Sequence, residues 1–254
     1  MNLLATGPDA PPRESQVAGW TLHEMDVAGS TNLIAATLGA WHAVRADTQT
    51  AGRGRFQRSW VSDAGGLWLS AVVPTGPDRP RWQTLPLVAG LAVIEALKQF
   101  GVDSARLRWP NDIMVNERKL AGLLVDNFTP QLAVVGLGVN VNNHPDECDT
   151  TLKDTTTRLA DLVPQPPSLA TLTAAILVAL RAAIDSLTTG GFGALHLRIN
   201  QLWGGMRRVT LDLDGVQRSG LFTGVDDYGR LLLQDEALRI TALEPHQVRL
   251  LREI

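Results

Sequence analysis

The chain has 254 residues, of which 44% are hydrophobic and 19% are charged, a composition typical of one large globular domain or of one large and one small domain. A formal net charge of −3 excludes an overall basic field that would attract nucleic acid or an anionic membrane. The single cysteine, Cys148, excludes an internal disulfide and, by itself, a structural zinc site.

The N-terminal residues are rich in proline and polar side chains and contain no long apolar run. We therefore expect a flexible N-terminal segment (1–18) and no signal peptide. The lack of a signal peptide and the single cysteine together favour a cytoplasmic protein. Ordered structure is expected to begin near Gly19, and Ser30 is expected to cap a short helix that starts at Thr31.

The next part of the chain alternates between strand and helix signals. An apolar run at 67–73, which Pro74 ends, predicts a strand. Apolar residues that lean to one face predict a helix at 84–100, with Gly101 as its cap. Further strands are expected at 105–109, 112–115, 120–126 and 131–141, with a hairpin turn at 116–118.

A long helix is expected at 168–187, after a proline-rich break. Its apolar residues recur every three or four positions and polar residues interrupt them, so we expect a core helix and no membrane span. Short strands separated by turn residues follow at 208–213, 218–225, 229–234 and 238–242, which suggests a small β-barrel. The expected fold class is α+β, with folded domains at 19–203 and 204–254.

A glycine- and arginine-rich segment reads Gln49-Thr50-Ala51-Gly52-Arg53-Gly54-Arg55-Phe56-Gln57-Arg58-Ser59-Trp60. Glycines let backbone N–H groups approach a phosphate, and arginines supply planar forks for phosphate or carboxylate oxygens. A solvated basic turn, or a loop that binds RNA phosphates, would explain the same pattern. Because like charges repel, we expect the arginine-containing part of this segment, which we call the anion loop (53–60), to be mobile without ligand and to close over an anion.

Three further segments place polar or small residues at strand ends. In Arg108-Trp109-Pro110-Asn111-Asp112, the aspartate could bind Mg²⁺ or orient a nucleotide, although Asn-Asp is also a common turn. In Lys119-Leu120-Ala121-Gly122, the lysine could neutralise an anion, although an exposed lysine on an ordinary strand is the favoured interpretation of this segment alone. In Gly136-Leu137-Gly138-Val139-Asn140, no third glycine and helix follow, which excludes a dinucleotide fingerprint; Asn140 could read an adenine edge.

In this order, the segments resemble the catalytic module of biotin protein ligases. The resemblance rests on Ser30-Thr31-Asn32, the stretch from Gln49 to Arg55, and the three segments just quoted, and it extends from about residue 20 to the C-terminus. It implies a mixed sheet flanked by helices, as in class II aminoacyl-tRNA synthetases, followed by an SH3-like β-barrel. Only about 18 residues precede the pattern, which implies the monofunctional type without an N-terminal DNA-binding domain.

The resemblance also implies a two-step reaction. Biotin's carboxylate attacks the α-phosphate of ATP to form biotinyl-5′-AMP, and a lysine of a biotin carboxyl carrier domain then attacks the mixed anhydride. Cationic side chains and the Mg²⁺ that accompanies ATP would neutralise the crowded oxygens. A lipoate or octanoate ligase is one alternative function. A biotin-responsive repressor is another, which the short N-terminal segment and the net acidity disfavour, so we expect no specific DNA binding.

The residues implied for catalysis are Arg53, Arg55, Asp112 and Lys119, with Asp112 as the candidate Mg²⁺ ligand. The residues implied for biotin binding are Ser30, Thr31, Asn32, Gln49, Gly52, Arg53, Gly54, Arg55, Lys119, Gly122, Leu123 and Leu137. The residues implied for ATP or adenylate binding are Arg53, Arg55, Arg58, Trp60, Asn111, Asp112, Lys119 and Asn140.

Two positions depart from the family pattern. Gln57 stands where the loop usually has glycine, which restricts the backbone there. Arg108 replaces the lysine that usually precedes Trp-Pro-Asn-Asp, so a compact ammonium becomes a planar fork. The oligomeric state is open between a monomer and a homodimer, and a homodimer could pair the strands around 132–141 as a sheet edge.

Overall fold

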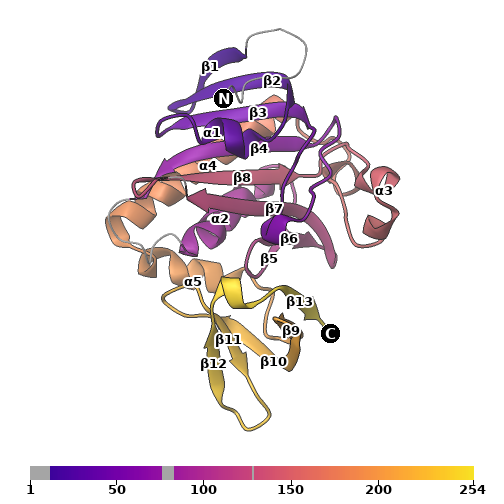
Figure 1. The fold of residues 1–254 in the computed structure, drawn as a ribbon, viewed down its shortest axis with the longest axis vertical. Coiled ribbons are helices and arrows are strands. Elements are labelled where there is room, and N and C mark those ends of the chain that lie inside the picture. Colours follow the sequence, from indigo (N-terminus) through magenta and orange to yellow (C-terminus); the bar gives the residue numbers. More distant parts are fainter. Residues whose placement is uncertain (1–11, 76–82, 128) are drawn as a thin grey trace.

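In this computed structural model, residues 12–75, 83–127 and 129–254 are described, and their strands form two sheets (Figure 1). The large sheet has the order β1-β2-β3-β4-β8-β7-β6-β5, and the small one β12-β11-β10-β9-β13. The strands of the large sheet are β1 (Arg13–Val17), β2 (Trp20–Ala28), β3 (His42–Gln49), β4 (Leu67–Pro74), β5 (Arg106–Arg108), β6 (Asp112–Val115), β7 (Arg118–Asn127) and β8 (Leu132–Val139). The described pairs are antiparallel except β2 with β3, so the sheet is mixed, as predicted.

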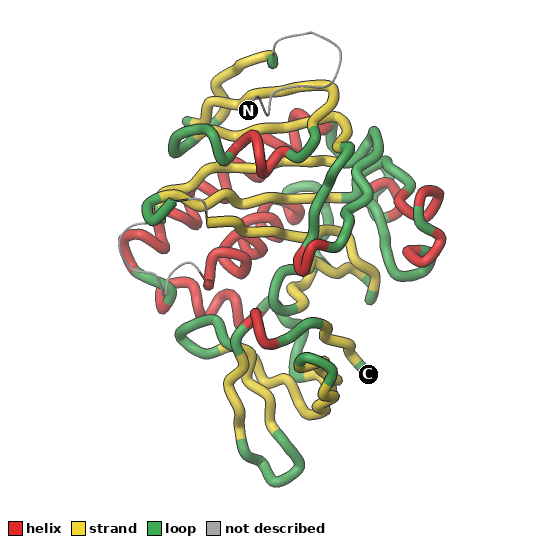
Figure 2. The backbone as a smooth tube through the Cα atoms, viewed as in Figure 1, coloured by secondary structure: helices red, strands yellow, loops and turns green. Residues whose placement is uncertain are grey.

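Helices cover the large sheet unequally (Figures 1 and 2). The helices are α1 (Thr31–Ala35), α2 (Leu85–Lys98), α3 (Pro145–Cys148), α4 (Leu169–Gly190) and α5 (Gly193–Gln201). The long helices α2 and α4 lie on one face, where their apolar side chains and those of the sheet form the main core. The short α1 lies on the other face over a small apolar cluster that includes Val44, Val72 and Val134. The rest of that face is left for a pocket.

Strand β4 illustrates why the sheet forms here. Its run from Leu67 to Val73 is buried throughout, which is the pattern of a strand covered on both faces. Because side chains alternate along a strand, Ala71 and Val73 face the main core, whereas Val72 faces α1. Ser70 lies on the same face as Val72 and is fully buried. The strand therefore delivers one polar group to the side of the sheet that α2 and α4 do not cover.

Helix α4 is long and apolar enough to cross a membrane by length and composition alone. Its residues at the predicted three- and four-residue spacing, from Leu172 to Leu187, are instead buried in the main core. The indole nitrogen of Trp20 donates to the carbonyl of Leu177 over 3.0 Å, which fixes β2 to the helix. These contacts are those of a core helix, as predicted.

The small C-terminal sheet consists of β9 (Arg207–Leu213), β10 (Val216–Val225), β11 (Leu231–Gln234), β12 (Ile240–Leu243) and β13 (Leu250–Glu253). Arg106 of β5 joins it to the large sheet. Its guanidinium contacts both carboxylate oxygens of Glu253, at 2.9 and 2.6 Å, and Glu117 at 2.5 Å. Because Arg106 is 8% exposed and its charge is fully paired, this cluster fixes the position of β13 against the large sheet.

Some sequence predictions fail in detail. The segment 1–18 is not flexible throughout, because β1 pairs Arg13–Val17 with β2; residues 1–11 lie outside the described part. Strand β3 and helix α5 were not predicted, since β3 carries few large apolar residues and α5 follows glycines that suggested a loop. Strand β8 lies between β4 and β7, so it is not a free sheet edge and cannot pair across a dimer in the way considered above.

Candidate active site

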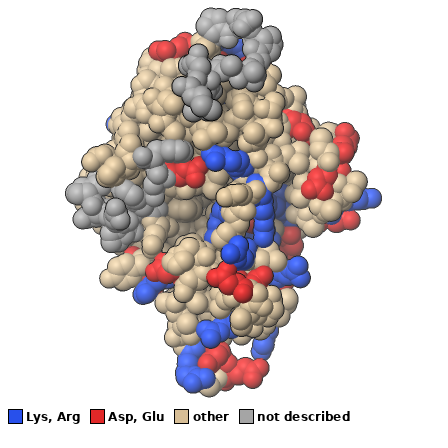
Figure 3. All heavy atoms as spheres, in the orientation of Figure 1, with Lys and Arg blue, Asp and Glu red and all other residues tan. Residues whose placement is uncertain are grey.

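A cavity of about 350 Å³ lies on the face of the large sheet that α2 and α4 leave uncovered. The ends of β6, β7 and β8, helix α1, the anion loop (53–60) and residues 248–251 of the C-terminal part line it. Lysine and arginine atoms gather along its mouth (Figure 3). All of the predicted site residues except Gly52 line this cavity. Gly52 sits just outside, where an added Cβ would lie 2.5 Å from the Ser62 hydroxyl and the Trp60 carbonyl.

One end of the cavity is built from neutral polar groups around the start of α1. The Gln49 side-chain carbonyl accepts from the Thr31 backbone N–H at 2.8 Å and from the Thr31 hydroxyl at 3.0 Å. The Gln49 amide nitrogen donates to the Ser62 hydroxyl at 2.9 Å, and Ser62 donates to the Trp60 carbonyl at 3.1 Å. We call this region, which also includes Ser30, Asn32 and Ser70, the polar end.

The amide of Asn32 is fixed on both sides. Its oxygen lies 2.6 Å from the Ser70 hydroxyl, and its nitrogen donates to an Asp126 carboxylate oxygen at 2.8 Å. Gly136 lies against the amide, because an added Cβ would be 2.2 Å from the Asn32 oxygen. Ser30 is 4% exposed, and in the described part of the chain no group hydrogen-bonds to its hydroxyl, so this hydroxyl is available to a ligand.

The middle of the cavity is a flat floor of glycines covered by Trp60. An added Cβ at Gly138 would lie 2.5 Å from the indole nitrogen, and one at Gly122 would lie 2.8 Å from the indole ring. Only glycine allows this close approach of the ring to two neighbouring strands. Among the residues that the structure describes, the buried Trp60 indole nitrogen has no hydrogen-bond partner. The Lys119 ammonium lies 4.9 Å from the centre of the indole ring.

The opposite end carries an ion-pair cluster, which we call the charged end. One carboxylate oxygen of Asp112 lies 2.6 Å from the Lys119 ammonium, and the other lies 2.7 Å from the Arg108 guanidinium. Burial alone would raise the pKa of Asp112, but the two cations outweigh it, so the pKa lies below its ordinary value. Asp112 is therefore ionised at neutral pH.

This arrangement bears on the predicted metal role of Asp112. Both of its oxygens are already engaged by cations, so neither is available as a ligand. Among the described residues, no group of three or more histidine, cysteine, aspartate or glutamate side chains could hold a metal ion. The residues present do not fit a resident Mg²⁺ site at Asp112.

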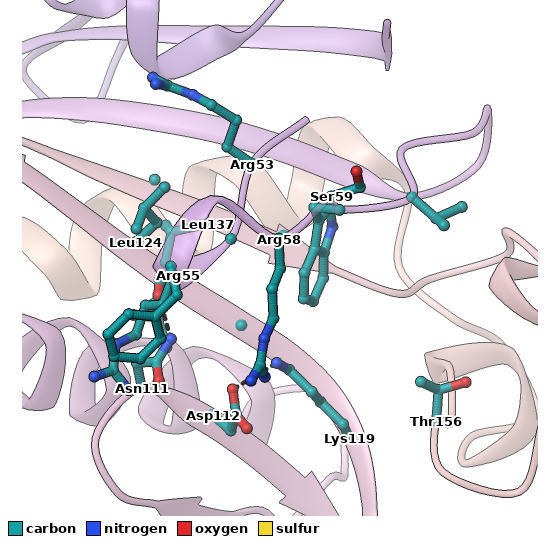
Figure 4. A pocket seen from close by; sticks show the side chains of 18 of the residues that line it. Arg53, Arg55, Arg58, Ser59, Asn111, Asp112, Lys119, Leu124, Leu137 and Thr156 are labelled. Carbon is teal, nitrogen blue, oxygen red and sulfur yellow. Dashed lines mark hydrogen bonds and ion pairs between the residues drawn. The ribbon is translucent and has the colours of Figure 1, made fainter. Parts of the chain in front are cut away.

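The anion loop folds over the cavity in one compact turn (Figure 4). Its Arg55 donates to the carbonyls of Pro245 at 2.6 Å and Val248 at 3.4 Å, and Arg58 donates to the carbonyl of Arg249 at 3.4 Å. Burial lowers the pKa of the Arg55 guanidinium, against the opposing effect of the Asp112 charge. Figure 4 places Arg58 beside Asp112 and Lys119, so two cationic side chains meet around one carboxylate at the charged end.

Arg53 points the other way, although it was grouped with Arg55 and Arg58 in the sequence analysis. Figure 4 shows its side chain directed away from Asp112 and Lys119. Its guanidinium lies 3.9 Å from the Asp126 carboxylate at the polar end. The loop therefore sends one arginine to the polar end and two toward the charged end.

The turn between Arg55 and Arg58 has an unusual backbone. Phe56 and Gln57 have φ angles of 55° and 58°, in the left-handed region that disfavours side chains with a Cβ. Gln57 is the residue that departs from the family's glycine, so the sequence departure coincides with backbone strain. The structure gives the loop a single folded arrangement, and its predicted mobility without ligand stays a prediction.

Two predicted adenylate-binding residues are engaged in structural hydrogen bonds. The Asn140 amide nitrogen donates to the carbonyl of Thr157 at 3.2 Å, and its oxygen accepts from Asn143 at 3.1 Å. Asn111 donates to the carbonyl of Leu123 at 2.6 Å. Each amide keeps one N–H that these bonds do not use, so both residues could offer a ligand a single donor.

Sequence reasoning missed several residues that hold the site together. Ser62, Ser70 and Asp126 fix the polar end, and the carbonyls of Pro245 and Val248 hold the anion loop. For Asp126, the position at the end of the predicted strand that begins with Lys119 was a usable signal. Backbone carbonyl groups carry no such signal in the sequence.

Comparison with known proteins bears on the chemistry of this site. Residues 36–140 match the family described as biotin/lipoate A/B protein ligases. A protein of Mycobacterium tuberculosis named biotin–[acetyl-CoA-carboxylase] ligase is 34% identical over 85% of this chain and 84% of its own length. The bifunctional ligase/repressor BirA of Bacillus subtilis is 32% identical over 87% of this chain and 71% of its own length.

A solved structure shares the whole architecture. The biotin protein ligase of Aquifex aeolicus, solved in complex with biotin and ATP, has a TM-score of 0.81 and 27% sequence identity. The match covers 92% of this chain and 99% of that one, so it includes both sheets.

Proposed function

The chain belongs to the biotin/lipoate A/B protein ligase family, and we propose that it forms biotinyl-5′-AMP from biotin and ATP and transfers the biotinyl group to a lysine of a carrier protein. The observation that carries this proposal is a single cavity with a neutral polar end and a cationic end. Biotin has a neutral ureido ring at one end and a carboxylate at the other, and the cavity has the same distribution of polarity.

The polar end suits the ureido ring because it offers fixed donors and acceptors without a net positive charge. Ser30, Thr31, Asn32 and Gln49 surround this position, and the Ser30 hydroxyl is free to turn toward a ring carbonyl. The apolar side chains of Leu123 and Leu137 line the same cavity and would contact the ring and the valeryl chain. Groups already held by one another lose little freedom when a ligand binds.

In the first step, a carboxylate oxygen of biotin attacks the α-phosphorus of ATP, and the bond to the bridging oxygen of pyrophosphate breaks. Negative charge accumulates on the phosphate oxygens, and Lys119, Arg55 and Arg58 lie where they can neutralise it. Asp112 holds Lys119 in place by its 2.6 Å contact. We propose that Mg²⁺ arrives as part of the MgATP substrate, since Asp112 does not offer a free oxygen for it.

In the second step, the amine of the carrier lysine attacks the carbonyl carbon of the anhydride, AMP leaves with the bonding electrons, and the proton that the nitrogen loses passes to solvent. The attacking amine must be neutral. Asp112 is a poor base for this proton, because two cations lower its pKa. Desolvation and the positive charge of the site favour the neutral amine instead.

The carrier is a biotin carboxyl carrier domain, as the names of the relatives suggest for those proteins. We further propose that the five strands of the C-terminal part form an SH3-like barrel, and that the enzyme works in the cytoplasm. The antiparallel order of the small sheet supports the first of these proposals.

The test is mass spectrometry of a carrier domain after incubation with this protein, biotin and MgATP. We expect a biotinyl adduct on one lysine. ATP–pyrophosphate exchange measured in parallel with biotin, lipoate and octanoate should require biotin. Exchange that depends on lipoate or octanoate instead would assign the chain to the other branch of the family, and no exchange with any acid would overturn the proposal.

A further inference from the structure

Asp126, at the end of β7, connects two parts of the pocket that are separate in the sequence. One of its carboxylate oxygens accepts from the Asn32 amide at 2.8 Å and lies 3.9 Å from the Arg53 guanidinium. Asn32 belongs to α1, and Arg53 belongs to the anion loop. The same carboxylate oxygen therefore holds both the polar end of the cavity and the base of the loop.

Asp126 is the nearer of two acceptors that set which way the Asn32 amide faces, the other being the Leu124 carbonyl at 3.5 Å. If that amide were turned over, its oxygen would lie beside a carboxylate oxygen, which is repulsive, and its nitrogen would face the Ser70 hydroxyl. Asp126 therefore draws the Asn32 nitrogen toward itself, which leaves the Asn32 oxygen facing Ser70. Because Gly136 closes one side of the amide, its position is as constrained as its orientation.

Hydrogen bonds continue from Asn32 to the far end of the loop. Ser70 lies 2.7 Å from the Thr31 hydroxyl, which lies 3.0 Å from Gln49. Gln49 donates to Ser62, which donates to the carbonyl of Trp60. The series of hydrogen bonds thus begins at Asp126, beside Arg53, and ends at Trp60. Arg53 and Trp60 are the two ends of the anion loop. Linked hydrogen bonds of this kind respond together when one member is lost.

We propose that Asp126 is a positioning residue that sets the Asn32 amide and the base of the anion loop together, so that recognition of the ring and the position of the loop are coupled. This inference rests on the proposed function, because it takes the polar end to be the site of the biotin ring. Asp126 lies at the edge of the site, with 30% of its side chain exposed, and does not line the cavity itself. It acts through Asn32 and Arg53.

Asp126→Asn is the first test, because it keeps the shape of the side chain and removes the charge. Hydrogen bonds to charged groups exceed neutral ones by about tenfold in binding, so the KM for biotin should rise about tenfold. The kcat of ATP–pyrophosphate exchange should change less than threefold, since the cations of the charged end are untouched. Asp185→Asn is the matched control. It removes the same charge from an exposed pair with Arg181 on α4, and both kinetic constants should equal those of the wild type.

Asp126→Glu should recover part of the lost biotin affinity, because it restores the charge one methylene farther out. A double-mutant cycle of Asp126→Ala with Arg53→Ala should be non-additive in the KM for biotin, as expected for residues that act as a unit. Limited proteolysis at Arg53 to Arg58 should be faster in Asp126→Asn than in the wild type or in Asp185→Asn. The thermal unfolding midpoint of each variant separates these effects from a loss of folding.

An unchanged KM for biotin in a folded Asp126→Asn protein would overturn the inference. Equal losses in kcat and in the affinities for biotin and ATP would also overturn it, because they would indicate general damage to the site. Failure of the wild-type protein to catalyse biotin-dependent exchange would instead contradict the proposed function. The two failures are therefore distinguishable in one set of assays.

Discussion

At the polar end of the pocket, neutral hydroxyl and amide groups hydrogen-bond to one another, and one carboxylate lies at the margin. At the charged end, by contrast, each cation is held by a carboxylate or by backbone carbonyls. Gln49 and Asn32 keep their orientations through neighbours in the large sheet, in α1 and in the segment that contains Ser62. Arg55 and Arg58 take theirs from the C-terminal part of the chain. A ligand at the polar end meets groups that are already oriented by one another, whereas a phosphate meets arginines that hold backbone carbonyls through Nη2 and keep their other N–H groups.

This contrast leads to different expectations for substitutions at the two ends. Changes at the polar end should alter biotin affinity at nearly constant kcat, because they affect ground state and transition state alike. Changes at the charged end should alter the chemical step, because phosphate charge develops there.

The largest effect is expected for Lys119→Ala. Removal of one preorganised cation from a developing phosphate charge typically costs about 100- to 1000-fold in kcat. Biotin-dependent ATP–pyrophosphate exchange should fall by about that factor. Asp112 keeps its contact with Arg108, so the protein should remain folded. An effect confined to the KM for biotin would contradict the assignment of Lys119 to the chemical step at the charged end.

Arg55→Ala should have a smaller effect on the same step and a clear effect on the intermediate. The loop would lose its bond to the Pro245 carbonyl, and the adenylate would lose one cation above it. We expect the bound biotinyl-5′-AMP to dissociate about 10- to 100-fold faster, as measured by chasing labelled intermediate with unlabelled biotin and ATP. Unaltered retention would remove Arg55 from the adenylate site.

Gly136→Ala tests the polar end. Its Cβ would lie 2.2 Å from the Asn32 side-chain oxygen, so the amide must move. The KM for biotin should rise about tenfold with little change in kcat. Gly193→Ala is the control, since an added Cβ there has no atom within 4 Å. A fall in kcat without a change in KM would argue against separate tasks for the two ends.

The smallest effect is expected for Gln57→Gly. A residue with a Cβ at φ 58° is strained by about 1 kcal/mol relative to glycine, although glycine also loses more entropy on folding. The free energy of unfolding in urea should rise by no more than about 1 kcal/mol. Adenylate formation should proceed at the wild-type rate or somewhat faster. A clear loss of stability would mean that the Gln57 side chain makes contacts that outweigh the strain.

Much of this site could be predicted because the short segments keep their order along the chain. Ser30, Gln49, Asp112 and Lys119 were assigned from motifs, and the structure places all four around one cavity. The motifs contain the polar and charged residue types that adenylate chemistry requires, and these types can be recognised in a single sequence. The apolar spacing of α4 and the buried run of β4 were equally direct signals.

The parts that could not be predicted depend on where side chains point. Arg53 and Arg55 look equivalent in the sequence, yet Arg53 lies beside Asp126 whereas Arg55 donates to the carbonyl of Pro245. Asp112 was a reasonable metal ligand by type, but its oxygens are taken by Lys119 and Arg108. These outcomes follow from pairing between distant elements, which single-sequence patterns do not contain.

The contact between Arg55 and Pro245 joins residues that are 190 positions apart. A ribosome adds about 5 to 20 residues each second, so the carbonyl partner of Arg55 is made roughly 10 to 40 s after Arg55 itself. During that interval the cavity lacks the wall formed by residues 248–251. The order of synthesis thus delays completion of the pocket until the C-terminal residues have been added and have folded against the large sheet.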